Sequence, residues 1–311
     1  MIRSFIQTVF GALTFIPGVY KWRASKLGSG GSYSARYCYT IWMRHIILAQ
    51  KSKLNHYPDV VAELGPGDSL GVGIMALLLG SNKYIACDVV EFTSVKKNLL
   101  ILEQLLEMLH NRESIPDDIE FPKVVPKLDD YSFPCEVYPD DYMRLNLLED
   151  RVDKIRSSII SQNKMIEYNP TWTKGHGMHE KSIDMIISQA VLEHVDDLES
   201  TYEVQKNWLN KDGFISHSID FKSHGYAPTW DGHWGISNWR WFLLRGNRPY
   251  MINRQPLSKH ISIIEKHNFK LIKVDNYFKD STFSIKKFKI VISENDRNIS
   301  DSFIQANSIR K

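Results

Sequence analysis

The chain has 311 residues, of which 43% are hydrophobic and 24% are charged. This ordinary globular composition excludes global disorder, a collagen-like repeat and a small scaffold built on disulfides. The net charge is +3, but residues 1–58 contain eight Lys or Arg residues and no Asp or Glu, so the remainder carries −5. A basic N-terminal region on a slightly acidic body suggests an anionic partner: phospholipid, nucleic acid or a charged substrate.

The first predicted element is an amphipathic helix that Pro17 ends. Its apolar residues, from Ile2 to Ile16, recur at steps of three and four residues. Such a helix either lies on a membrane, with residues 1–26 making a peripheral contact, or packs on the body or a second subunit. A signal peptide is disfavoured because Gln7 and Thr8 interrupt the apolar run. The sequence contains no run of 18 consecutive apolar residues, so no membrane-spanning helix is predicted.

The next elements alternate between helices and strands after a polar loop at residues 21–35. We expect helices over 36–54, 70–80, 93–110 and 151–163, and buried strands over 59–64, 84–89 and 164–168. Further strands are predicted over 183–188, 214–219 and 269–274, with helices over 198–209 and 257–267, a turn at 211–213, and one more strand near the C-terminus.

This alternation predicts an α/β fold with a seven-stranded, mostly parallel sheet and helices on both faces. A basic, helical N-terminal arm over residues 1–57 would precede one catalytic domain over residues 58–311. Within that domain, a helical insertion at about 93–163 separates the second and third strands, since the gap is too long for a simple crossover. A loop at about 220–256 is rich in aromatic residues and histidine.

A glycine-rich loop follows the first predicted strand and opens a helix. It reads Gly65-x-Gly67-x-x-x-Gly71, and Asp88 ends the next strand 21 residues beyond Gly67. Glycines let a ligand approach the backbone, and a carboxylate at that place can bind both ribose hydroxyls. A dinucleotide oxidoreductase and an S-adenosylmethionine enzyme both fit this pattern. Glu63 and Asp68 favour the second, because they would repel a pyrophosphate but suit an ammonium and a sulfonium.

Three segments resemble the motifs of class I S-adenosylmethionine-dependent methyltransferases. They are Glu63–Ser69, Ser182–Val195 and Leu209–Phe214, and the resemblance covers about residues 58–275. It implies a Rossmann-like fold with S-adenosyl-L-methionine as cofactor. Residues 220–256 and the N-terminal arm are similar to a bacterial subgroup associated with methylation of surface polysaccharides.

The resemblance also implies which residues hold the cofactor. Gly65 and Gly67 would allow the backbone approach within a loop that includes Asp68 and Ser69, and Glu63 would orient the amino group. The remaining contacts are Asp88 to the ribose, Val89 beside the adenine, and Ser188 with Gln189 flanking the sulfonium. Asn169 or Trp172 would take the place of the family's adenine-binding acid.

Histidines follow the fourth and fifth strands, where ligands bind in open α/β sheets. Because a hydroxyl nucleophile must lose a proton, we expect His224 or His233, ahead of His194, to act as base, with Asp220 orienting the imidazole. His217 is expected to pack inside the fifth strand. His217, Asp220, His224 and His233 carry donor atoms that suit a metal ion, but their spacing matches no metal signature, so no metal is predicted.

The loop at 220–256 also carries candidate substrate contacts. Trp230 and Trp234 could stack on a sugar ring, and Arg240 with Arg254 could bind an acidic group on it; alternatively, this is a lid packed on its own aromatic residues.

We therefore predict O-methylation of a sugar hydroxyl in a bacterial glycan or glycan precursor, in the cytoplasm or peripherally at the inner face of the membrane. The alternatives are an RNA or small-molecule methyltransferase, for which nucleic acid is the less favoured partner, an NAD(P)-dependent oxidoreductase, and a non-catalytic binding module. The oligomeric state is left open.

Overall fold

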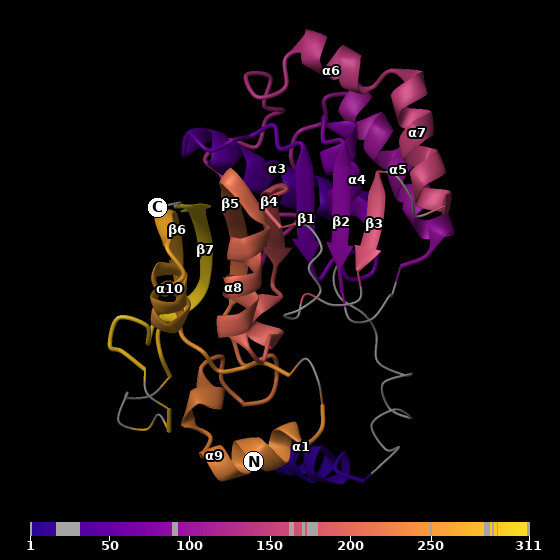
Figure 1. Cartoon of the computed structure of the whole chain (residues 1–311). Helices are drawn as coiled ribbons and strands as arrows, with labels where there is room; N and C mark the ends of the chain where they lie inside the picture. Colours follow the sequence, from indigo (N-terminus) through magenta and orange to yellow (C-terminus); the bar gives the residue numbers. More distant parts are fainter. Residues whose placement is uncertain are drawn as a thin grey trace.

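Seven strands form one sheet in the order β3-β2-β1-β4-β5-β7-β6 (Figure 1). Strands β1 to β5 are parallel, and β7 runs antiparallel to both of its neighbours. The strands are β1 (Val60–Leu64), β2 (Lys83–Cys87), β3 (Ile166–Asn169), β4 (Ile183–Gln189), β5 (Leu209–Asp220), β6 (Phe269–Phe278) and β7 (Ile299–Ser308). The predicted Rossmann-like fold with a mostly parallel, seven-stranded sheet is confirmed, with the glycine-loop strand β1 in the interior of the sheet.

The structure is a computed structural model. It describes residues 2–16, 32–88, 93–161, 165–169, 172, 180–248, 251–282, 287, 289–290 and 292–309. Three parts of the sequence lie outside these residues: Val89, the predicted adenine contact; the two histidines between residues 173 and 179; and most of the basic segment after Pro17.

Helices cover both faces of the sheet because successive strand residues point to opposite sides. One apolar cluster joins Val61 to α3 (Ala35–Lys51), α4 (Gly71–Leu78), α5 (Val95–His110) and α7 (Glu149–Ser161). The other cluster joins Ala62 to α8 (Leu198–Trp208) and α10 (Leu257–Lys266). The predicted insertion thus contributes α5, the short α6 (Asp140–Asn146) and α7.

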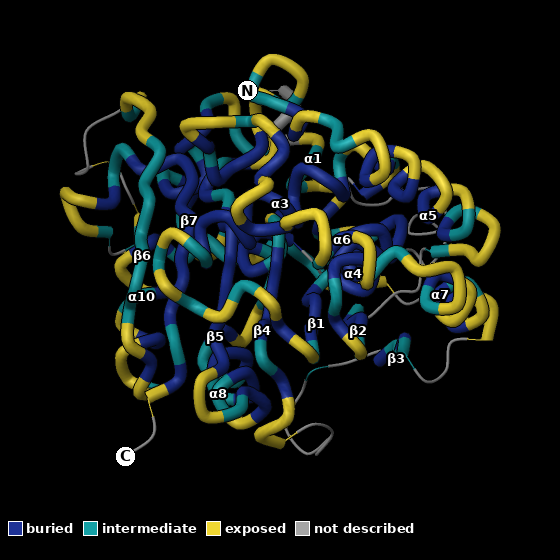
Figure 2. Tube along the Cα trace, turned by 90° about the horizontal axis from the view of Figure 1, so that it is seen from above, coloured by how far each residue is buried: buried dark blue, intermediate teal, exposed yellow. Residues whose placement is uncertain are grey.

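The predicted N-terminal arm divides into two parts with different surroundings. Helix α3 is almost wholly buried and packs on α4, as the dark-blue tube of Figure 2 shows. Gly71 on α4 lies so close to Cys38 that a Cβ at this position would collide with the Cys38 sulfur. Helix α3 therefore belongs to the main core rather than to an appended arm. Helix α1 (Ile2–Leu13) instead lies against α9 (Asn238–Arg245).

The predicted turn at residues 211–213 is absorbed into β5. The register of the β4–β5 pair shifts between Ile183, which pairs with Leu209, and Met185, which pairs with Phe214. The intervening residues form a bulge, with Lys211 and Asp212 exposed. Strand β5 therefore begins at Leu209 instead of Phe214, because a bulge can hold extra residues without ending the strand.

Candidate active site

The glycine loop connects β1 to α4 at the carboxyl edge of the sheet. Gly65 and Gly67 have φ values of +67° and +71°, a region that side chains with a Cβ rarely occupy. The Gly67 N–H points to a carboxylate oxygen of Asp88 at 3.4 Å. Asp88 therefore lies directly beside the loop, where the cofactor prediction places a ribose-binding carboxylate.

The segment before α3 fixes this loop from its other side. The Ser32 hydroxyl donates to the Pro66 carbonyl and accepts from the Ser69 N–H at 3.1 Å. The Ser69 hydroxyl donates to the Ser32 carbonyl. Since Ser32 and Ser69 pair their hydrogen-bonding groups with each other, Ser69 holds the conformation of the loop. The sequence carried no signal for Ser32, which lies far from the glycine motif.

Two acidic groups accompany the loop, as the sequence indicated. Glu63 is 4% exposed and accepts a hydrogen bond of 2.6 Å from the Tyr84 hydroxyl. Burial, opposed by this hydrogen bond and reinforced by the charge of Asp88, raises the pKa of Glu63 to about 8. Burial also raises the pKa of Asp68, while Lys97 opposes it. A ligand with an ammonium or sulfonium group would stabilise the charged form of Glu63, whereas a pyrophosphate would not.

The glycine loop contacts the segment that follows β4. A Cβ placed on Gly65 would lie 2.6 Å from Cγ2 of Val191, so the loop and this segment approach one another without room for a side chain. Val191 is followed by the 3₁₀ turn η1 (Leu192–His194). The residue before it, Ala190, has a φ of +54°. The cofactor loop and the predicted catalytic histidine His194 therefore belong to neighbouring parts of one site.

Four ionisable side chains gather where β4 and β5 end. Glu193 and His194 come from η1, and Asp220 and His224 come from the end of β5 and the loop after it. The His224 Nε2 atom lies 3.4 Å from Asp220 Oδ2, and the His194 and His224 rings meet edge to face at 5.0 Å. The structure thus brings together three of the four predicted catalytic residues, and adds Glu193.

Asp220 is the fixed negative charge of this cluster, and the imidazole of His224 lies beside it. Burial alone would raise the pKa of Asp220, but the hydrogen bond to His224 and the charges of Lys222 and His224 lower it to about 2. Asp220 is therefore ionised at neutral pH. It can hold the imidazole of His224 in one orientation, as a carboxylate does in other acid–base pairs.

Glu193 was not singled out from the sequence, although it lies within a quoted motif. It is 3% exposed, and neither carboxylate oxygen forms a hydrogen bond among the described residues. Burial, reinforced by the charge of Asp220 and opposed by the backbone N–H groups of Glu193 and Asp220, raises the pKa of Glu193 well above its usual range. One donor atom each of Glu193, His194 and His224 lie within 4.8 Å of one another, a set that could hold a divalent cation.

His233 was predicted as a possible base, but its position in the structure does not suit that role. It is 2% exposed, its ring lies 4.9 Å from that of Trp234, and burial with the charge of Arg254 lowers its pKa to about 3. An imidazole enclosed in this way cannot reach a substrate hydroxyl without displacement of the loop. His233 therefore serves packing, which leaves His224 and His194 as the accessible histidines.

The two predicted stacking residues are also buried. Trp230 and Trp234 are 8% and 1% exposed and pack edge to face at 5.9 Å. The indole N–H of Trp230 donates to the Asp280 carbonyl at 2.9 Å. The prediction that they stack on a sugar ring is therefore wrong for this conformation, and the alternative of a lid packed on its own aromatic residues describes them.

The two predicted arginines have different surroundings. Arg254 donates to the Ile236 carbonyl at 2.8 Å and to the Asn238 side chain at 2.9 Å, and its guanidinium lies 4.5 Å from the Trp241 ring centre. Burial lowers its pKa to about 10. Arg254 thus ties together the loop before α9 instead of presenting its donors to a ligand. Arg240, on α9, is half-buried.

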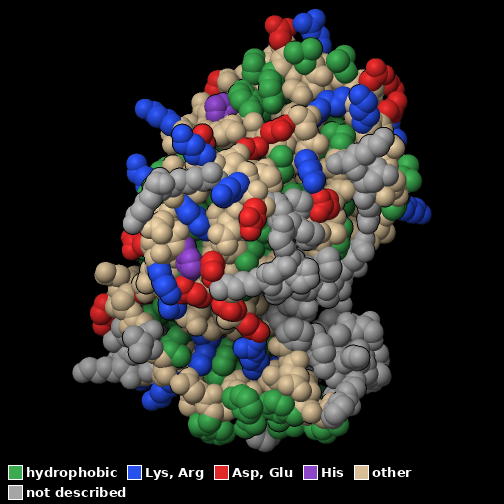
Figure 3. Space-filling model, viewed as in Figure 1, with side chains coloured by type: hydrophobic (Ala, Val, Ile, Leu, Met, Phe, Trp, Pro, Cys, Tyr) green, Lys and Arg blue, Asp and Glu red, His purple; other side chains and the backbone are tan. Residues whose placement is uncertain are grey.

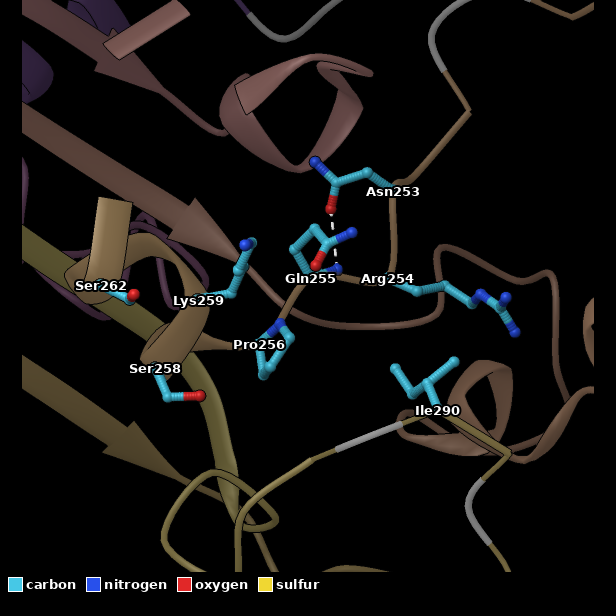
Figure 4. Close-up of a pocket in the computed structure, with 8 residues that line it drawn as sticks. All are labelled: Asn253, Arg254, Gln255, Pro256, Ser258, Lys259, Ser262 and Ile290. Carbon is cyan, nitrogen blue, oxygen red and sulfur yellow. Dashed lines mark hydrogen bonds between the residues drawn. The ribbon is translucent and has the colours of Figure 1, made fainter. Parts of the chain in front are cut away.

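Asn253 connects this loop to the segment that carries Glu193 and His194. Its side-chain N–H₂ group donates to the carbonyls of Leu192 and Val195 at 2.7 and 2.8 Å, and its backbone N–H donates to the Glu193 carbonyl at 2.6 Å. A shallow hollow beside it is lined by residues of this segment and of α10; in Figure 4 the Arg254 side chain points away from Lys259. The hollow is separate from the cluster of Glu193, His194, Asp220 and His224, which we call the catalytic cluster.

The predicted sulfonium-flanking residues take part in a buried polar network. The Ser188 hydroxyl lies 2.8 Å from Nδ1 of His217, and the Gln189 side-chain oxygen lies 3.2 Å from Nε2 of His45. Gln189 also donates to the Val125 carbonyl at 3.1 Å. His217 is fully buried, as expected, and burial lowers its pKa to about 3. The role of His45 was not foreseen, because a histidine within an apolar helix gives no sign of its partner.

Comparison with known proteins gives structural likeness only. No protein-family model and no curated protein sequence matches the chain. A solved structure assigned as an S-adenosylmethionine dependent methyltransferase from Listeria monocytogenes is 12% identical, with a TM-score of 0.43 over 84% of this chain and 98% of that chain. Geranyl diphosphate C-methyltransferase from Streptomyces coelicolor A3(2) is 10% identical, with a TM-score of 0.43 over 86% of this chain and 77% of that one. An S-adenosylmethionine dependent methyltransferase from Mesorhizobium loti is 12% identical, with a TM-score of 0.41 over 80% and 90% of the two chains.

Proposed function

We propose that this protein is an S-adenosylmethionine-dependent methyltransferase that transfers a methyl group to a hydroxyl of a sugar in a glycan or glycan precursor. The observation that carries the proposal is the contact of Gly65 with Val191. It joins a cofactor-type glycine loop to the segment that carries His194 and Glu193. A cofactor bound at this loop would thereby lie next to the proton acceptor, which in-line methyl transfer to a hydroxyl requires.

The residues around the loop fit S-adenosylmethionine better than a dinucleotide. The buried Glu63 directly precedes the loop, and Asp68 lies within it at 8% exposure. Asp88, beside Gly67, would accept hydrogen bonds from the ribose hydroxyls. When bound, the cofactor supplies an electrophilic methyl group. The chain's own residues then have to hold the acceptor and remove one proton.

His224 is the proton acceptor that the geometry favours. Its Nε2 faces the ionised Asp220, so its other ring nitrogen can accept the proton of an acceptor hydroxyl. Positive charge on the imidazole would be stabilised by the carboxylate at 3.4 Å. His194, in edge-to-face contact with His224, would limit the rotation of that ring.

The class of acceptor is proposed from the base and from the aromatic loop. A hydroxyl is favoured because a base dyad is present and because an amine nucleophile needs less help with its proton. We propose a sugar as the acceptor because the loop at 220–256, which carries His224, is rich in aromatic residues, although Trp230 and Trp234 themselves are buried. RNA is the alternative acceptor, and its binding would weaken steeply with salt.

Calorimetry with S-adenosylhomocysteine tests the cofactor. Asp88→Ala should weaken binding by about 1.5–3 kcal/mol, the range for hydrogen bonds to a charged group. Asp141→Ala is the matched control, because Asp141 is an exposed carboxylate paired only with Arg144 on α6 among the described residues. Tight NADH binding, or equal affinity of the two variants, would contradict the proposal.

Single-turnover kinetics with sugar-nucleotide and glycan-precursor mixtures tests the base, with a 14 Da mass increase as the readout. His224→Ala should slow methyl transfer by roughly 10²–10⁴-fold with cofactor affinity unchanged. His110→Ala, an exposed histidine on α5, is the control. Near-native rates in His224→Ala would exclude this base, and turnover of RNA but not of sugars would exclude the acceptor.

A further inference from the structure

Helix α1 meets the rest of the molecule through its small and polar residues. Gly11 lies against the backbone of α9, where a Cβ would collide with main-chain carbonyl oxygens. The Thr14 hydroxyl accepts from the Asn247 N–H at 2.9 Å, and the Gln7 side chain donates to the Gly225 carbonyl at 3.1 Å. The polar stripe of this amphipathic helix is thus the one that faces the protein.

The apolar stripe of the same helix faces outward. Ile6, Val9, Phe10 and the residues that follow them on this side are exposed to between 37% and 54%. Helix α9 continues this surface with Trp239 and Phe242, which are 68% and 62% exposed. Figure 3 shows the hydrophobic side chains gathered along the lower edge of the molecule, where Figure 1 places α1 and α9. We call this surface the α1–α9 face; its exposed apolar residues are Ile6, Val9, Phe10, Leu13, Phe15, Ile16, Trp239 and Phe242.

This orientation is the reverse of the usual one for a helix on a globular protein, which buries its apolar stripe. The reversal is held in place by the Thr14 and Gln7 hydrogen bonds and by ring contact between Phe15 and Phe242, whose centres are 5.1 Å apart. A contiguous exposed apolar patch of this kind marks a site of contact with a membrane or another protein.

The sign of the charge on these helices selects the partner. Neither α1 nor α9 contains an acidic residue, and Arg240 and Arg245 belong to α9. In the sequence, no acidic residue occurs before Asp59, and Lys21, Arg23 and Lys26 follow within 13 residues of the end of α1. An apolar helical face on basic helices is the pattern of an interfacial helix on anionic lipid. With 12 residues, α1 is too short to cross a bilayer, and no helix among the described residues is long and apolar enough to do so.

We propose that the α1–α9 face docks on an anionic lipid bilayer, with α1 and α9 lying in the headgroup region. Docking would also position the catalytic cluster. Gln7 is bonded to Gly225, the residue next to His224, so the catalytic loop is fastened to the docking helix. An acceptor carried at the membrane surface would then reach His224 from the bilayer; this last consequence alone rests on the proposed methyltransferase function.

Vesicle flotation of the full chain tests the docking independently of any enzyme assay. Wild-type protein should float with phosphatidylcholine vesicles that contain phosphatidylglycerol and much less with pure phosphatidylcholine, and added salt should weaken the binding. Trp239→Glu and Phe242→Glu should each reduce the partition coefficient by about tenfold or more, because each removes one large apolar side chain from the lipid contact.

Leu100→Glu and Ile160→Glu are the matched controls. These residues are 60% and 59% exposed, on α5 and α7, away from the α1–α9 face, and their variants should float as wild type does. Equal flotation of all four variants, or no flotation of the wild type, would overturn the proposal. A dimer in sedimentation analysis that Phe242→Glu dissociates, without lipid binding, would overturn it in favour of a second copy of the chain.

Discussion

Buried titratable groups should give this protein a stability maximum near pH 6.5. Burial lowers the pKa of four histidines: His45 to about 4 and His217, His233 and His260 each to about 3. Each stays neutral in the folded state while its unfolded counterpart, with a pKa of about 6.5, takes up a proton below that pH. Their contribution to stability is therefore complete above about pH 6.5 and is lost as the pH falls.

Two buried carboxyl groups act in the opposite direction. Burial raises the pKa of Glu63 to about 8 and that of Glu193 well above its usual range. The folded state keeps these protons at neutral pH, whereas the unfolded state loses them above about pH 4.3. Their contribution is therefore complete at low pH and is lost as the pH rises toward 8. Asp220, with a pKa of about 2, stays ionised throughout this range.

The balance between the histidines and the carboxyl groups determines how steeply the free energy of unfolding changes with pH. Below about pH 6 the unfolded chain takes up four imidazole protons and the folded chain already holds two carboxyl protons, a net difference of two. At about 1.4 kcal/mol per proton and pH unit, the free energy of unfolding should fall by up to roughly 3 kcal/mol per unit on acidification. Above about pH 7 only the carboxyls contribute, so the free energy of unfolding should fall again as the pH rises.

Urea unfolding between pH 5 and pH 8, at constant ionic strength, measures this curve. His260→Gln should reduce the acid slope by about 1.4 kcal/mol per pH unit, since it removes one titrating imidazole. His110→Gln, at an exposed position on α5, should leave the slope unchanged. A free energy of unfolding that is constant from pH 7 to pH 5, or equal slopes in these two variants, would refute the reasoning.

Three other substitutions or conditions give sharp tests. Gly65→Ala should weaken S-adenosylhomocysteine binding and destabilise the fold. Adding Val191→Ala should recover the steric part but leave about 1–2 kcal/mol of strain at positive φ, so full recovery would contradict the left-handed conformation of Gly65. Arg44→Met should lower the free energy of unfolding in urea by about 3 kcal/mol or more, because the fully buried Arg44 guanidinium donates to the carbonyls of Pro116, Val124 and Pro126. Arg36→Ala, at an exposed ion pair, is the control and should lower it by about 1 kcal/mol or less. EDTA should leave methyl transfer intact and zinc should inhibit it by occupying His224; loss of activity in EDTA with recovery on adding metal would make His224 a ligand rather than a base.

The sheet could be predicted because each strand carries its own pattern. The runs at 59–64 and 183–188 are apolar and bounded by turns or polar residues, and the glycine loop marks the carboxyl end of the first. The place of α3 could not be predicted, since a basic helix before the first strand has the composition of an appended arm. Its burial depends on Gly71 and Cys38, which meet only in three dimensions.

The loop at 220–256 was the hardest part to predict. The sequence does not distinguish an exposed tryptophan from a buried one. Only the contacts of the folded loop separate Trp234, which is 1% exposed, from Trp239, which is 68% exposed. Arg254 is likewise indistinguishable from a substrate contact until its donors are seen to bind Ile236 and Asn238 within the loop. Long loops take their conformation from tertiary packing, so their residue types alone do not assign roles.

The position of each histidine relative to the strand ends decides its chemistry. His217 lies within β5, three residues before Asp220, and its ring nitrogens are both used by Ser188 and Gln205. His224 lies four residues beyond Asp220, where the strand has ended and the ring is partly exposed. Burial makes the first a neutral cross-link between β5, β4 and α8. The second is partly exposed and uses one ring nitrogen toward Asp220, so its other nitrogen can face an acceptor. The same side chain thus supports the fold inside the sheet and can perform acid–base chemistry only at its carboxyl edge.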